Sequence, residues 1–159
     1  MRLAPEREEA VVRPVLGMGR ERRARLIIDH LVLEDFKSYA GRQVIGTFHG
    51  NFTSVVGPNG SGKSNLIESM LFIFGFNASW MRLNKLNQLI HNSSTATGNS
   101  KAAVEVHFKK VQENQQGVLE DVPNSLFWIR RTVNSSSVSK YFIDGRESTQ
   151  AEVKDRLRS

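Results

Sequence analysis

The sequence predicts an α/β fold in which one central helix follows a glycine-rich loop and packs on a β-sheet. Two observations indicate this class. An apolar run at 52–57 leads directly into the glycine-rich loop, and apolar residues recur at helical spacing after it. Strand-like segments lie before and after this unit, which predicts a mixed sheet. Only one strand–loop–helix unit is visible, so we expect part of a larger core rather than a complete doubly wound domain.

The composition is that of an ordinary globular chain, with 159 residues, 39% hydrophobic and 24% charged. The absence of cysteine excludes a disulfide scaffold and a cysteine-ligated metal, and the four histidines have no metal-site spacing. His30 and His107 are interpreted as ordinary sheet residues. The longest apolar run, 70–76, is far shorter than the ~20 residues of a membrane span. No apolar stretch follows Met1 as a secretory signal requires, so we expect a soluble intracellular chain without a membrane partner.

The net charge of +6 favours an anionic partner such as nucleic acid. A second reading is that a tail supplies much of this charge, because seven arginines lie within the first 25 residues. Residues 1–24 combine mixed charges with two prolines, which predicts a disordered basic extension. The string "RERRAR" (20–25) is read as a solvated arginine cluster, with a weak nuclear-import patch as the alternative.

Before the loop, strands are expected over 25–36, with a switch of face near Asp29, and over 42–48. The run 52–57 is continuously apolar, which is typical of a strand buried on both faces. The following helix should end at Gly75, and its apolar residues at helical spacing are Leu66, Ile67, Met70, Leu71, Ile73 and Phe74.

After the helix, the sequence predicts a short helical segment at 80–91 and a polar loop at 92–101. Residues 103–111 alternate apolar and polar side chains, as in a strand with one buried face. Segments 126–133 and 138–144 read as a hairpin. Thr149 and Glu152 form a capping box that should open a last helix reaching the chain end.

The glycine-rich loop matches G-x-x-x-x-G-K-[ST], the pattern of a loop that binds the phosphates of a nucleotide. Glycines allow consecutive N–H groups to curl around phosphate oxygens, and a helix beginning near Gly62 directs its positive end at the same anion. Lys63 would bring a charge to the β- and γ-phosphates, and the Ser64 hydroxyl would bind Mg²⁺. The residues of the loop are Gly57, Pro58, Asn59, Gly60, Ser61, Gly62, Lys63 and Ser64.

Hydrolysis would also require an acidic residue for Mg²⁺ at the end of an apolar strand. The string "LVLED" (31–35) lies before the loop and reads as a strand end. The string "YFID" (141–144) ends in Asp144, but Gly145 follows it, so we expect a turn. The sequence therefore contains a phosphate-binding half and lacks a convincing catalytic half.

Longer strings around the loop resemble the structural maintenance of chromosomes (SMC) family, ATPases with an ABC-type head. The strings are "FKSY" (36–39), "GPNGSGKSN" (57–65) and "ESMLFIFG" (68–75). "LNQLIHNS" (86–93) and "VPNSLFWIRRTV" (122–133) are most similar to the larger SMC subunits of condensin. The likeness covers roughly 25–158 and implies that residues 25–159 are the N-terminal lobe of a P-loop NTPase head of the ABC type.

The resemblance implies ATP and Mg²⁺ as ligands of the loop, with Asn65 included. In this family, the signature motif and the catalytic acidic residues come from a C-terminal lobe of the same full-length chain, joined through a coiled coil and a hinge. We therefore expect this segment to be inactive alone. Lys37 and Ser38 match positions near the nucleotide, with a charged turn as the alternative. Arg82 matches an arginine loop that faces the active site and DNA, with a solvated arginine as the alternative.

The implied partners are the second condensin SMC subunit, the non-SMC condensin subunits and DNA or chromatin. The implied role is ATP-driven chromosome condensation during the cell cycle, in the nucleus and on chromosomes, with a cytoplasmic pool outside mitosis. Trp80 and Trp128 are expected to pack in the core or against helices. A DNA-contacting surface could draw on Lys85, Lys101, Lys109, Lys110, Arg130 and Arg131, each of which could equally be a solvated strand residue.

Two other functions stay open at this point. A small self-contained P-loop NTPase or kinase would use Asp144 and turn over nucleotide alone. A basic nucleic-acid-binding module would bind DNA in a salt-sensitive manner without dependence on Lys63.

Overall fold

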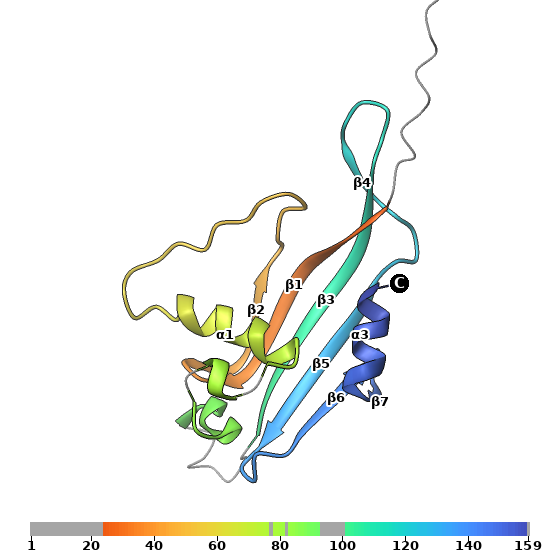
Figure 1. Ribbon diagram of the computed structural model, residues 1–159. Helices are drawn as coiled ribbons and strands as arrows, with labels where there is room; N and C mark the ends of the chain where they lie inside the picture. Colours follow the sequence, from red (N-terminus) through yellow and green to blue (C-terminus); the bar gives the residue numbers. More distant parts are fainter. Residues whose placement is uncertain (1–23, 77, 82, 93–100, 159) are drawn as a thin grey trace, which may run out of the picture.

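The computed structural model describes residues 24–76, 78–81, 83–92 and 101–158. Its main feature is a seven-stranded sheet of order β2-β1-β3-β5-β6-β7, with β4 paired to β3 (Figure 1). All described strand pairs are antiparallel. The strands are β1 (Arg25–Phe36), β2 (Tyr39–Gly46), β3 (Lys101–Glu113), β4 (Leu119–Asp121), β5 (Phe127–Asn134), β6 (Ser139–Ile143) and β7 (Arg146–Ser148).

Two α-helices cover one face of this sheet. Helix α1 (Lys63–Ile73) packs over β3 and β5, and α3 (Gln150–Arg158) packs beside β6. Two short 3₁₀ turns, η1 (Ala78–Met81) and η2 (Leu86–Leu89), lie between α1 and β3 along the chain. The predicted α/β class, with the helix after the glycine-rich loop packed on a sheet, is confirmed.

The core forms between the helices and the inner face of the sheet. On β3, Val104, Val106 and Phe108 are buried, whereas Glu105 and His107 point to the other face, as the alternation predicts. Phe72 of α1 is fully buried against this face. Burial of one such side chain contributes about 1.5–3 kcal/mol, so the apolar face of α1 fixes the helix on the sheet.

The switch of face expected near Asp29 is also confirmed. The pairing register between β1 and β3 shifts between Ile28 and His30, so the residues before and after this bulge use opposite alternation. Leu31 and Leu33, which follow the bulge, both reach the core.

The C-terminal end of α1 is held by a buried cation. Gly75 has a left-handed φ of 89°, which a glycine adopts without strain, and the helix ends there as predicted. Arg131 of β5, 8% exposed, donates to the Phe72 carbonyl at 2.6 Å and to Ser139 Oγ at 3.1 Å. Its guanidinium also lies 4.4 Å from the centre of the Phe72 ring. Burial lowers the pKa of Arg131 below its ordinary value.

The outer face of the sheet carries a network of ion pairs. Arg130 bonds to Glu34 at 2.5 Å and to Glu105 at 3.3 Å. Lys109 bonds to Asp29 at 3.1 Å and to Asp121 at 3.0 Å.

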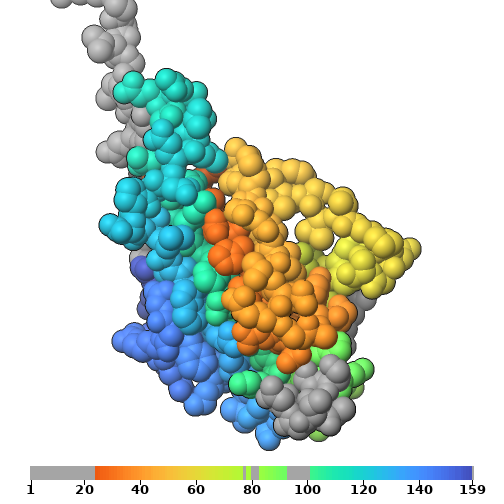
Figure 2. All heavy atoms as spheres, turned by 180° about the vertical axis from the view of Figure 1, so that it is seen from behind, coloured from red at the N-terminus to blue at the C-terminus, as the bar shows by residue number. Residues whose placement is uncertain are grey.

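Between these two groups of ion pairs, the rings of His30 and His107 stack with their centroids 4.0 Å apart, as residues of neighbouring strands. Figure 2 shows the molecule from behind the view of Figure 1, so that the outer face of the sheet, away from α1 and α3, is turned toward the reader.

The predicted hairpin and capping box are both present. Strands β5 and β6 pair across residues 135–138. At the start of α3, Thr149 N donates to Glu152 Oε2 at 2.6 Å and Glu152 N donates to Thr149 Oγ1 at 3.2 Å. The Glu152 carboxylate accepts from Thr149 N and, at 3.0 Å, from the Thr149 hydroxyl, and these two bonds hold the pKa of that carboxyl below its ordinary value.

Three local predictions are wrong. Residues 52–57 form no strand, and Phe52 and Val56 are 77% and 85% exposed, because no described strand pairs with this segment after the chain leaves the sheet at Gly46. The helical segment expected at 80–91 is instead divided into the two short turns η1 and η2. The second strand ends at Gly46 rather than at residue 48. The short strands β4 and β7 carried no distinct sequence pattern and were missed.

Some predictions fall on residues outside this description. The disordered basic extension over 1–24 lies almost wholly in 1–23, and most of the predicted polar loop lies in 93–100. Among the described helices, none combines the length and the apolar character that crossing a membrane demands.

Replacing Arg131 with alanine should lower the free energy of unfolding by about 2–4 kcal/mol, because the change removes the donor to the Phe72 carbonyl and leaves a cavity beside the rings of Phe72 and Tyr141. Urea denaturation measures the difference. Lys140→Ala is the control, since it breaks an exposed pair with Glu147 and should change stability by under about 0.5 kcal/mol. Equal effects of the two variants would contradict the anchoring role of Arg131.

The Arg130 pair should make stability depend on pH. The Arg130 guanidinium beside Glu34 holds the pKa of that carboxyl below its ordinary value of 4.5. Because the folded-state pKa is the lower one, the contribution is complete above pH 4.5 and is lost as the pH falls through the folded-state pKa.

Urea denaturation at about pH 6 and about pH 3 should therefore show a larger stability gap between wild type and Arg130→Gln at the higher pH. Arg42→Gln is the matched control, because Arg42 is 60% exposed and lies 3.9 Å from the same carboxylate. A gap that stays constant across this range would exclude the pair as the source of the acid sensitivity.

Candidate phosphate-binding site

The glycine-rich loop runs into the N-terminal end of α1. Gly60 and Gly62 have left-handed φ values of 82° and 90°. A side chain on Gly62 would also collide with its surroundings, since a Cβ there would lie 2.8 Å from Ser38 Oγ and 3.1 Å from Tyr39 Oη. Glycine at 62 is therefore required both by the backbone angle and by the close approach of the neighbouring turn.

The loop and the first turn of α1 enclose a hollow of about 250 Å³. No acidic residue lines it or lies in the first turn of α1, and Gly62, as the N-cap, offers no side-chain acceptor. The first N–H groups of a helix lack intrahelical partners and carry partial positive charge. The hollow therefore suits an anion, and its lining residues are Asn59, Gly60, Gly62, Lys63, Ser64 and Asn65.

Lys63 lies folded over its own loop. Its ammonium donates to the carbonyl oxygens of Gly57 at 2.6 Å and Pro58 at 2.5 Å. These two bonds hold a positive charge at the loop and close the loop into a compact ring. The ammonium has a third N–H group for a further acceptor.

The turn between β1 and β2 packs against the loop and α1. Lys37 forms an ion pair with Glu68, and Asn65 Nδ2 donates to Ser38 Oγ at 2.8 Å. Lys37 N donates to the Leu89 carbonyl at 2.7 Å, which ties the turn to η2. The structure thus brings Lys37 and Ser38 beside the loop, as the resemblance implies, although the Lys37 ammonium is already paired with a carboxylate.

Tyr39 belongs to this site and was missed in the sequence. Its hydroxyl donates to the Gly62 carbonyl at 3.1 Å, and burial raises its pKa above the ordinary value. The only signal was its place directly after Lys37 and Ser38, which does not reveal that its hydroxyl reaches the loop.

One further candidate, Asp144, is not brought to the loop. Asp144 lies in the turn between β6 and β7 with a φ of 49°, and its carboxylate accepts a hydrogen bond from Trp128 N at 2.9 Å. It is a turn residue, as predicted, at the side of the sheet away from β2. Arg82 lies outside the described residues.

The candidate DNA-contacting residues divide into two groups. Arg131 is buried, and Lys109 and Arg130 are paired with carboxylates, so these three side chains are engaged within the fold. The other three lie nearer the surface, with Lys85 and Lys101 exposed and Lys110 half-buried.

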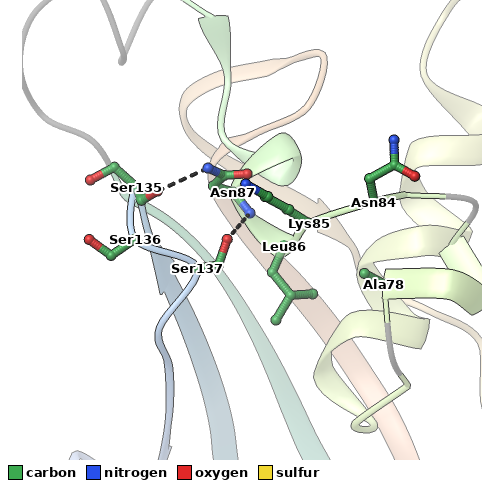
Figure 3. A pocket seen from close by; sticks show the side chains of 8 residues that line it. All are labelled: Ala78, Asn84, Lys85, Leu86, Asn87, Ser135, Ser136 and Ser137. Carbon is green, nitrogen blue, oxygen red and sulfur yellow. Dashed lines mark hydrogen bonds between the residues drawn. The ribbon is translucent and has the colours of Figure 1, made fainter.

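Lys85 lines a separate cavity of about 540 Å³ between residues 84–87 and the serines of the β5–β6 loop (Figure 3). Asn87 joins the two sides, donating from Nδ2 to the Ser135 carbonyl at 2.9 Å and from its N–H to Ser137 Oγ at 3.2 Å. No residue of the glycine-rich loop lines this cavity.

An apolar groove of about 350 Å³ lies between the segment before the loop and α1. Phe52, Val55 and Ile67 contribute exposed side chains to it, at 77%, 45% and 55% exposure. Ile28 and Met70 line it from β1 and α1. In Figure 1 the segment between β2 and α1 arches away from the sheet. Exposed apolar side chains gathered in one groove are typical of an interaction surface.

Comparison with known proteins places this geometry in a family. A model of the RecF/RecN/SMC N terminal domain matches residues 27–159. Structural maintenance of chromosomes protein 4 from Mus musculus is 47% identical over 135 residues, which are 85% of this chain. They are 10% of the mouse protein, so the chain spans about a tenth of the length of this curated relative.

Solved structures agree. One solved structure comes from work on the ATP-driven dimerization and DNA stimulated activation of SMC ATPases. Its TM-score against this chain is 0.66 at 34% sequence identity, and the match covers 82% of this chain and 77% of that one. The Smc head domain of Pyrococcus furiosus bound to the C-terminal domain of ScpA has a TM-score of 0.65 and 32% identity, covering 84% of this chain and 33% of that one. The chain therefore belongs to the RecF/RecN/SMC N-terminal domain family, and its predicted membership of the SMC proteins is confirmed.

Proposed function

We propose that this chain is the ATP-binding N-terminal lobe of a condensin-type SMC ATPase head. The observation that carries the proposal is the acid-free hollow at the N-terminal end of α1, where Lys63 holds a positive charge beside left-handed glycines. A helix terminus, a glycine-rich loop and a lysine together form a site for a polyphosphate.

The residues of the loop fit ATP with Mg²⁺. The N–H groups of the loop and of the first turn of α1 would bind phosphate oxygens, and Lys63 would exchange its bonds to loop carbonyls for bonds to the β- and γ-phosphates. The Ser64 hydroxyl at the helix start would bind Mg²⁺, which would neutralise charge on the phosphates. Ser38, Lys37 and Asn65 would border the nucleotide from the side of the turn.

The apolar groove supports a second lobe as the partner of this chain. Phe52 and Val56 are large apolar side chains that are mostly exposed to solvent. Their segment has the apolar pattern of a buried strand, but no described strand pairs with it. We assign the groove to the C-terminal head lobe of the same full-length chain, which would add strands beside residues 52–57. By the resemblance to SMC proteins, that lobe would also carry the acidic residues for hydrolysis.

Similarity to known proteins supports a wider role for the proposed lobe. The similarity to the SMC protein 4 of mouse supports a condensin subunit acting in chromosome condensation, in the nucleus and on chromosomes. A neighbouring structure binds ScpA, which supports non-SMC subunits as partners beside a second SMC head, and another is described with DNA stimulation, which supports DNA or chromatin as a ligand. Arg82, which lies outside the described residues, would contribute an arginine loop.

Replacing Lys63 with alanine should weaken binding of Mg·ATP by about 10²-fold or more, because two charge-assisted hydrogen bonds to phosphate are worth ~1.5–3 kcal/mol each. Isothermal titration calorimetry measures the affinity. Lys85→Ala is the control, as this lysine lines the separate cavity beside the β5–β6 loop. The phosphate-site assignment fails if the two variants bind alike.

The isolated chain should show no useful steady-state ATP hydrolysis, since hydrolysis requires an acid that the loop region does not supply. A phosphate-release assay on purified chain tests this, with Lys63→Ala as the background. Turnover that disappears in both Lys63→Ala and Asp144→Ala would instead identify a self-contained NTPase. Salt-sensitive DNA binding that is unchanged in Lys63→Ala, without nucleotide binding, would identify a nucleic-acid module.

A further inference from the structure

The carbonyl of Gly62 stands at the junction between the glycine-rich loop and α1, and two donors hold it. The N–H of Leu66 donates to it at 3.1 Å as the first helical hydrogen bond. The hydroxyl of Tyr39 donates to it at 3.1 Å from β2. The first bond exists in any α-helix, whereas the second comes from a different element and depends on the tertiary fold.

The direction of this carbonyl determines where the next N–H group points. A peptide unit is planar and trans, so the N–H of Lys63 lies antiparallel to the C=O of Gly62. With the carbonyl directed along the helix, this N–H is directed out of the helix end. It is one of the groups without an intrahelical acceptor, and Lys63 lines the hollow at this end.

Tyr39 is itself held in a fixed place. The turn before it is tied to η2 by the bond from Lys37 N to the Leu89 carbonyl, and to α1 by the bond from Asn65 to Ser38. The Tyr39 side chain packs on the hydrophobic core. A tyrosine hydroxyl keeps its proton at neutral pH, and burial raises the pKa of Tyr39 further above its ordinary value.

We propose that Tyr39 is a positioning residue of the phosphate site, whose hydroxyl fixes the Gly62–Lys63 peptide so that the Lys63 N–H faces the bound phosphate. The inference rests on the proposed nucleotide binding. It adds a contact from β2, outside the glycine-rich motif, that controls the geometry of the motif.

Tyr39→Phe in the 159-residue chain tests the proposal, because it removes the hydroxyl and keeps the ring. Affinity for Mg·ATP should fall about three- to tenfold, because the Lys63 N–H would no longer be held toward the phosphate before binding. The thermal midpoint without nucleotide should fall by only a few degrees, as the loss of one neutral hydrogen bond predicts. Tyr141→Phe is the matched control, because the Tyr141 hydroxyl lies near Gly75 at the opposite end of α1. The affinity of this variant for Mg·ATP should equal that of wild type.

A direct spectroscopic readout separates positioning from general stability. The carbonyl ¹³C resonance of Gly62 should shift in Tyr39→Phe and stay in place in Tyr141→Phe. If Tyr39→Phe does not fold, exchange of the Tyr39 hydroxyl proton in the wild-type protein still tests whether the bond to the Gly62 carbonyl forms. A Tyr39 hydroxyl proton protected from exchange supports the bond, and one that exchanges too rapidly to be detected overturns it.

The titration separates two failures. If Lys63→Ala weakens binding by about 10²-fold or more and Tyr39→Phe binds like wild type, the positioning role is wrong and the phosphate site stands. If Lys63→Ala binds like wild type, the nucleotide site itself is wrong.

Discussion

The fixed position of α1 on the sheet is the constraint on which the rest of the structure depends. Phe72 and Ile73 are almost fully buried, and each contributes about 1.5–3 kcal/mol of apolar burial. Apolar burial sets which face of the helix meets the sheet, but it has no direction and does not by itself fix the position of the helix along its axis. The bond from Arg131 to the Phe72 carbonyl fixes the C-terminal end, and the bond from Tyr39 to the Gly62 carbonyl fixes the N-terminal end. The loop takes its place from a helix that is held at both ends by strands.

The two faces of the sheet are stabilised by different interactions, apolar burial on the inner face and ion pairs on the outer face. The inner face excludes water with Val104, Val106 and Phe108, whereas the outer face joins β1, β3 and β5 through the Arg130 and Lys109 ion pairs. These pairs are partly exposed, so each contributes less than a buried aromatic side chain. They nevertheless specify register, because a slip of one residue would place each cation on the opposite face from its carboxylates. Their engagement also removes Arg130 and Lys109 from the charge available to a nucleic acid.

Sequence reasoning succeeded where a local pattern decides the structure. The alternation of β3, the bulge near Asp29 and the capping box of Thr149 and Glu152 each depend on residues close in sequence, and all three are present. The prediction of a strand at 52–57 is wrong because an apolar run indicates only that a segment prefers burial. A strand also needs a neighbouring strand to which its backbone can hydrogen-bond. The phosphate loop could be found because its spacing is local. Tyr39 could not, since its contact with Gly62 spans 23 residues and depends on how β2 packs against α1.

The exposed apolar segment and the phosphate loop are covalently continuous, so docking of the proposed second lobe would be linked to the proposed nucleotide binding. Val55 and Val56 directly precede Gly57, whose carbonyl accepts a hydrogen bond from Lys63. Any strand that pairs with residues 52–57 must fix their backbone, and with it the direction in which the chain enters the loop. The far end of the loop is already fixed at Gly62 by Tyr39. A loop held at one end is free to close over its own lysine, whereas a loop held at both ends has its N–H groups arranged before the phosphate arrives. Docking of a second lobe on the apolar groove would therefore raise nucleotide affinity by lowering the entropy lost on binding, without adding a contact to the nucleotide.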